Sequence, residues 1–138
     1  MSNEFVFNWK PVEEESIIKD LHRPVINVEL KSQSGEWKIF YPEVDSGAPM
    51  SVFNESDCEL LGYKLTDGTS FNLHGVLGGS TPSYLHKIKM KIGDEVINSR
   101  VAFTEGKNHK QLIGRTDVFD YFRICLRGKL LKTSFIKE

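Results

Sequence analysis

One tetrapeptide, Asp45-Ser46-Gly47-Ala48, brings a carboxylate, a hydroxyl and a flexible backbone together between two apolar stretches. A carboxylate on such a tight loop can accept a proton from water or donate one to a carbonyl oxygen. Gly47 lets the backbone turn sharply and approach a partner closely, and the Ser46 hydroxyl can donate to a backbone group. The same letters are also common in solvated turns, where an aspartate caps its own backbone. The chemistry therefore depends on what else the chain carries.

Two further segments follow in order along the chain. The first is glycine-rich, lies within a hairpin pattern, and consists of His74, Gly75, Val76, Leu77, Gly78 and Gly79. Its glycines predict a mobile hairpin tip, although a plain glycine-rich loop fits the same letters. The second segment, Leu112-Ile113-Gly114-Arg115, leads into the last part of the chain, and on its own it reads equally well as a strand that ends at a glycine.

The order and spacing of these three segments resemble the retropepsins, the retroviral-type aspartic proteases, and in particular a short prokaryotic member. The resemblance spans residues 23–126 and includes Arg23-Pro24 before the first strand and a Gly-Arg-x-Asp-x-Phe motif that begins at Gly114. It implies that Asp45 is the catalytic carboxylate and that Ser46, Gly47 and Ala48 complete the catalytic loop. It assigns residues 74–79 to a substrate-binding flap. It assigns Gly114, Arg115 and Arg23 to the support of the site.

Aspartic proteolysis needs two adjacent carboxylates that share a proton, and this sequence has one Asp-Ser/Thr-Gly. Asp67-Gly68-Thr69 has similar letters in another order and predicts a hairpin turn. The resemblance therefore implies a homodimeric endopeptidase in which each subunit contributes one Asp45 to activate a water. Phe5, Phe7 and Trp9, or residues 130–136, are candidates for a sheet shared between the subunits. Two alternatives remain: a catalytically weak or inactive dimeric peptide-binding or scaffolding module on the same fold, and an unrelated barrel with coincident motifs.

The elements that must position these residues are predominantly strands. Apolar residues alternate with polar ones in residues 25–30, 36–41, 87–92 and 96–103. Frequent turn signals predict an all-β chain, mainly an antiparallel closed β-barrel of the acid-protease type, with short helices at 56–61 and 116–122. Pro42 cannot donate to a strand ladder, so it predicts an interruption just before Asp45. We assign residues 1–22 to an N-terminal extension and 23–138 to the protease-like domain.

Composition excludes several other classes of protein. The length of 138 residues favours one domain, and 18 basic against 19 acidic residues show no excess that points to nucleic acid. The chain has no apolar run of about 20 residues and no apolar signal core, which predicts a cytoplasmic protein without a membrane span. Cys58 and Cys125 are expected to be free thiols. The four histidines are scattered, so we expect neither a metal nor another cofactor.

Overall fold

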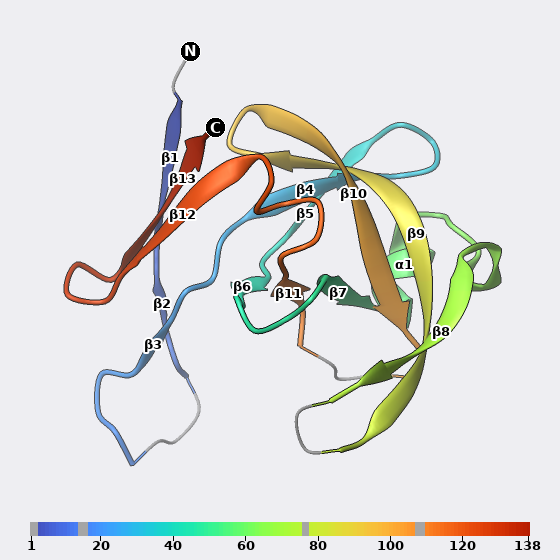
Figure 1. The fold of residues 1–138 in the computed structure, drawn as a ribbon, viewed down its shortest axis with the longest axis horizontal. Coiled ribbons are helices and arrows are strands. Elements are labelled where there is room, and N and C mark those ends of the chain that lie inside the picture. Colours follow the sequence, from blue (N-terminus) through green and yellow to red (C-terminus); the bar gives the residue numbers. More distant parts are fainter. Residues whose placement is uncertain (1–2, 14–16, 76–77, 107–109) are drawn as a thin grey trace.

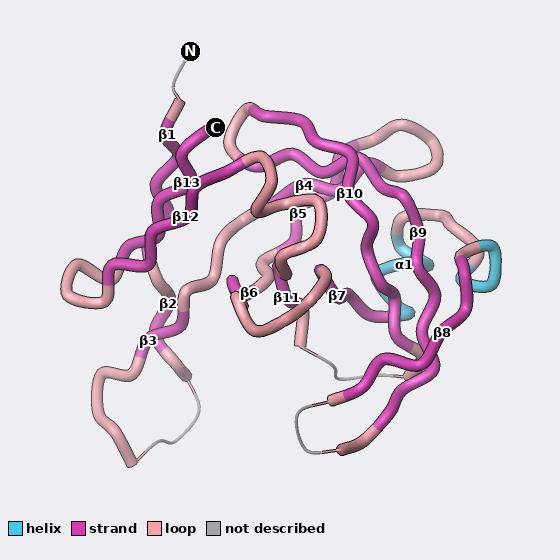
Figure 2. The backbone as a smooth tube through the Cα atoms, viewed as in Figure 1, coloured by secondary structure: helices cyan, strands magenta, loops and turns pink. Residues whose placement is uncertain are grey.

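The computed structural model describes residues 3–13, 17–75, 78–106 and 110–138, and strands dominate it (Figures 1 and 2). The predicted all-β class is confirmed. The strands form an eight-stranded sheet, a three-stranded sheet and a small two-stranded ribbon. No helix among the described residues is long and apolar enough to cross a membrane.

The eight-stranded sheet curls around the core and carries the candidate site. Its strand order is β5-β4-β9-β10-β7-β11-β6, and β8 pairs with β9 outside that path. The strands are β4 (Val28–Lys31), β5 (Trp37–Phe40), β6 (Glu43–Val44), β7 (Ser51–Asn54), β8 (Thr69–His74), β9 (Ser80–Ile92), β10 (Glu95–Thr104) and β11 (Leu112–Ile113). The ladder is an open path rather than the expected closed barrel, but its ends approach each other. Val25, just before β4, forms an isolated bridge to Glu43 in β6.

Alternation along the long β9–β10 hairpin builds the core, as the sequence predicts. Ile88, Met90 and Ile92 of β9 are buried, whereas the alternating lysines point away from the core: Lys87 and Lys89 are exposed and Lys91 is half-buried. The hairpin turns at Gly93, which has a φ of +63° that favours glycine. Aromatic side chains extend the core, with ring centroids 5.6 Å apart for Phe40 and Phe53 and 6.4 Å apart for Phe53 and Phe103.

The three-stranded sheet joins the two ends of the chain, in the order β1-β13-β12. Its strands are β1 (Glu4–Asn8), β12 (Phe122–Arg127) and β13 (Lys132–Lys137), and the ribbon pairs β2 (Lys10–Pro11) with β3 (His22–Arg23). The rings of Phe7 and Phe135 pack edge to face, with their centroids 5.7 Å apart. The segments that were candidates for a sheet between subunits therefore pair with each other within one chain. The outer edges of β1 and β12 carry no partner strand in the described structure.

The helical content agrees with one of the two predictions. The first predicted helix is present as α1 (Glu55–Leu60), whose start is fixed by a 2.8 Å hydrogen bond from the Asn54 N–H to the Asp57 carboxylate. The helix predicted at 116–122 is wrong, because this stretch forms turns and Asp117 has a φ of +62°, outside the helical region.

The hairpin turn predicted at residues 67–69 is wrong as well. A 3-10 turn, η1 (Leu65–Asp67), replaces it. The His86 ring explains the difference, since one of its nitrogens lies 2.9 Å from the Leu65 carbonyl oxygen and the ring packs against Gly68.

Candidate active site

The Asp45 loop, residues 45–50, lies between β6 and β7. Strand β5 ends at Phe40 and β6 begins at Glu43, so the interruption predicted from Pro42 is confirmed. Asp45 is half-buried, and its Oδ1 accepts a hydrogen bond of 2.9 Å from the Gly47 N–H. The Asp45 carbonyl accepts a second bond, of 3.1 Å, from the Ala48 N–H. The loop is thus a tight turn that fixes the direction of the carboxylate, while Ser46 and Gly47 at its tip are exposed.

Residues 113–115 support this loop from behind. The Asp45 N–H donates to the Ile113 carbonyl at 2.9 Å, and the Arg115 N–H donates to the Ala48 carbonyl at 3.0 Å. The Arg115 guanidinium adds a bond of 2.7 Å from Nη1 to the Ser46 carbonyl. The predicted support residues Gly114 and Arg115 therefore lie directly against the predicted catalytic loop.

Gly114 has a specific steric reason to be glycine. A Cβ atom at this position would overlap the Met50 carbonyl group and lie 2.8 Å from the Met50 Cα. The Gly114 N–H donates to the Ser51 Oγ at 3.1 Å, and both groups are buried. Two backbone segments therefore meet at a distance that no side chain permits.

The β8–β9 hairpin contributes the opposite wall of a cavity that contains Asp45. At the hairpin tip, the Gly75 N–H donates to the Gly79 carbonyl at 2.7 Å, and the Gly78 N–H donates to the Gly75 carbonyl at 3.1 Å. Val76 and Leu77 lie outside the described residues. The cavity has a volume of about 370 Å³ and is lined by Asp45, Gly47, Ala48, Pro49, Val52, Leu73, His74, Gly75, Thr81, Thr104, Lys110 and Leu112. The predicted catalytic loop and the predicted flap hairpin therefore line the same cavity.

Arg23 lies beside the site rather than in it. Its Nε is 3.8 Å from Glu43 Oε1, in the strand that leads to Asp45. Both residues line a neighbouring pocket of about 270 Å³ with Lys110 and Gln111.

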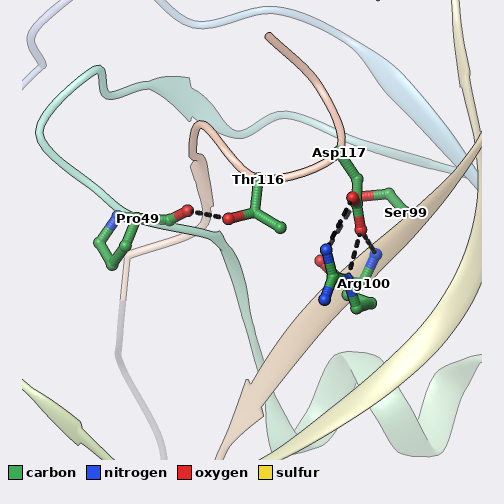
Figure 3. A network of polar contacts seen from close by, with 5 residues as sticks. All are labelled: Pro49, Ser99, Arg100, Thr116 and Asp117. Carbon is green, nitrogen blue, oxygen red and sulfur yellow. Dashed lines mark hydrogen bonds and ion pairs between the residues drawn. The ribbon is translucent and has the colours of Figure 1, made fainter. Parts of the chain in front are cut away.

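A second charged pair fixes the turn after Arg115 (Figure 3). The Arg100 guanidinium donates to both carboxylate oxygens of Asp117, at 2.8 and 3.0 Å, and the Arg100 N–H adds a bond of 2.9 Å. These hydrogen bonds hold the pKa of Asp117 below its usual value. The Thr116 hydroxyl and N–H both donate to the Pro49 carbonyl, at 2.6 and 2.9 Å. The turn is therefore tied both to β10 and to the Asp45 loop.

Two residues of the site, Ser51 and Lys110, were not predicted from the sequence. Ser51 carried one usable signal, because it is a small polar residue within the otherwise apolar stretch 50–53, whereas Lys110 lies in a polar loop without any pattern. The thiol of Cys58 is no alternative nucleophile, because burial raises its pKa to about 11. Among the described residues, no three histidine, cysteine or acidic side chains gather closely enough to hold a metal.

Comparisons with known proteins bear on the fold alone. No protein-family profile and no curated protein sequence matches the chain. A solved structure does match: EIAV protease in complex with the inhibitor HBY-793, with a TM-score of 0.52 and 19% sequence identity. The match covers 74% of this chain and 88% of that protease. The chain therefore has a fold similar to that of a retroviral protease.

Proposed function

We propose that the chain is an aspartic endopeptidase that acts as a homodimer, with one Asp45 from each subunit. One observation carries the proposal: the Asp45 carboxylate is oriented by the Gly47 N–H and borders a cavity whose other wall is a glycine-tipped hairpin. Similarity of fold to a retroviral protease supports it. The geometry suits a peptide that lies extended between loop and hairpin, bound through its backbone.

The chemistry follows from placing two such carboxylates side by side. Two carboxylates about 3 Å apart share one proton, because both cannot be ionised at that distance. The ionised group takes a proton from a bound water while the protonated group donates to the scissile carbonyl oxygen. The hairpin then covers the peptide and excludes bulk water, and the glycines at its tip permit the opening that admits substrate.

The exposure of the Asp45 loop is compatible with a second subunit that supplies the other carboxylate. Ser46 and Gly47 lie at the surface of the single chain, where a twofold-related loop can meet them. In the proposed dimer the Ser46 hydroxyl braces the two loops, and the Arg115 side chain holds the Ser46 carbonyl from behind. The unpaired edges of β1 and β12 offer further strand positions for a second copy.

A peptide-library digest between pH 4 and 7 tests the proposal, with and without a statine-type inhibitor. We expect wild-type protein to cleave and Asp45→Asn to lose at least about a thousandfold in rate while keeping its fold and its dimer. Asp67→Asn is the matched control, because Asp67 is exposed and stands outside the Asp45 cavity. Cleavage by Asp45→Asn at the wild-type rate would show the assignment to be wrong. A strict monomer in sedimentation at high concentration would exclude the shared site.

The peptide-binding module is the second candidate, and the covered cavity beside Asp45 is compatible with it. Its signature is binding of the statine-type inhibitor or of peptides with no cleavage of any library member by the wild-type protein. The same digest therefore separates the two functions.

A further inference from the structure

Lys110 is the one residue with a permanent positive charge among those that line the Asp45 cavity. It also borders the neighbouring pocket, where Arg23 is already paired with Glu43 at 3.8 Å. Within the described part of the chain, no carboxylate lies within ion-pair distance of Lys110. Its exposed ammonium group therefore faces two adjoining hollows with its charge available to a ligand.

The rest of the cavity wall suits an aliphatic stem. Leu73 of the hairpin and Leu112 of β11 supply apolar surface, together with Val52 from β7. Thr81 and Thr104 add hydroxyl groups, but the Thr104 hydroxyl already donates to the Phe53 carbonyl at 3.3 Å. Apart from the Asp45 carboxylate and the His74 ring, the wall is therefore largely apolar, and the Lys110 ammonium group lies at its border.

A peptide that fills this cavity removes water from the surroundings of Lys110. An apolar or amide side chain there would leave the ammonium group partly desolvated without a counter-charge, which is unfavourable. Lys110 would repel a lysine or arginine side chain placed beside it. A carboxylate would restore the lost hydration with charge-assisted hydrogen bonds. Glutamate fits better than aspartate, because its two methylene groups can cover the apolar wall while the carboxylate reaches the border.

We propose that this site prefers peptides with a glutamate in the position that enters the Asp45 cavity, with its carboxylate bound by Lys110. The preference concerns the substrate class and rests on the proposed function only for the cleavage that follows binding. Lys110 is a specificity-determining residue in this proposal and takes no part in proton transfer.

The test uses a series of labelled octapeptides in which one glutamate is moved through every position, each with a matched glutamine peptide. Binding is measured by fluorescence anisotropy with the full chain carrying Asp45→Asn, so that no peptide is consumed, and cleavage is measured with the parent chain. At one position we expect the glutamate peptide to bind about tenfold more tightly than its glutamine match. Lys110→Met should abolish that difference, and Lys110→Glu should transfer the preference to a lysine peptide.

Lys89→Glu is the matched control for charge. Lys89 is exposed on β9 and lines a different groove, so its reversal should leave the glutamate preference intact. Equal binding of glutamate and glutamine peptides at every position would overturn the proposal, whether or not cleavage occurs. Equal loss of preference in the Lys89 and Lys110 variants would also overturn it, because net charge would then be the cause. A preference that depends on Lys110 without cleavage by any chain would instead refute the endopeptidase and retain the recognition.

Discussion

Replacement of Gly114 by alanine tests whether the Asp45 loop is held in place by the direct backbone contact between Met50 and Gly114. The added Cβ would overlap the Met50 carbonyl and lie 2.8 Å from the Met50 Cα, where carbon atoms ordinarily rest about 3.5–4.0 Å apart. The Asp45 loop and β11 must therefore separate by about 1 Å. Because the obstacle is backbone, shortening the Met50 side chain would not relieve it.

The energetic cost follows from what this separation breaks. Forced overpacking costs about 1–3 kcal/mol. The bonds from the Gly114 N–H to Ser51 and from the Arg115 N–H to Ala48, at 3.1 and 3.0 Å, would stretch beyond useful length. Their loss adds about 1 kcal/mol each. Alanine recovers about 0.4–1 kcal/mol by restricting the unfolded chain. The net expectation is a loss of about 2–4.5 kcal/mol in the free energy of unfolding.

Urea denaturation followed by tryptophan fluorescence measures this loss, at one fixed protein concentration because association would shift the midpoint. We expect Gly114→Ala to lower the urea midpoint by about 1–2 M. Gly128→Ala is the matched control: its Cβ would lie 3.9 Å from the Trp9 ring, an ordinary contact, so stability should change by less than about 0.5 kcal/mol. If the two alanine variants are equally stable, the close approach at Gly114 does not hold the loop.

The remaining predictions concern side chains outside the Asp45 cavity. Asp117→Asn keeps a residue that tolerates positive φ but removes the ion pair with Arg100. Since Arg100 lowers the pKa of Asp117 from 3.8, the stabilisation is fully present above about pH 4 and disappears as pH falls through the lowered value. Urea midpoints measured across pH 2–7 give the difference in stability between Asp117→Asn and wild type. We expect this difference to disappear at the acidic end of the range. A difference that does not change with pH would contradict the prediction. Cys58 is fully buried and has a pKa of about 11, so in the native protein it should react with iodoacetamide far more slowly than half-buried Cys125. Mass spectrometry of the alkylated chain measures both rates, and equal rates would contradict the prediction.

Periodicity predicted the parts of the fold in which burial alternates along a strand. The β9–β10 hairpin was predictable because Ile88, Met90 and Ile92 alternate with lysines and Gly93 marks the turn. The helix expected at 116–122 failed for a tertiary reason. Its apolar stripe is real, since Val118 and Phe122 are buried. The backbone, however, is set by the bidentate contact between Asp117 and a residue 17 positions earlier, which no local pattern encodes.

The candidate site was predictable only as far as three segments identify it by their order along the chain: the Asp45 loop, the glycine-rich hairpin and the segment that contains Gly114. Asp45 and Gly47 could be named because proton transfer and a sharp turn restrict their residue types. Gly114 was named from the resemblance alone, and the structure supplies its steric reason. Lys110 could not be named in this way, because a lysine in a polar loop is ordinary until the fold places it at the Asp45 cavity.

The pairing of the chain's two ends has a consequence for how the protein is made. β1 is synthesised before the other strands that the structure describes, and its ladder partner β13 is synthesised after them. Until β13 is made, Phe5 and Phe7 have no strand beside them, and the pairing of Glu4 with Ile136 joins residues that are far apart in the sequence. The three-stranded sheet can therefore form only after β13 has been synthesised. A nascent chain stalled before residue 132 would expose an apolar strand that chaperones and aggregation compete for.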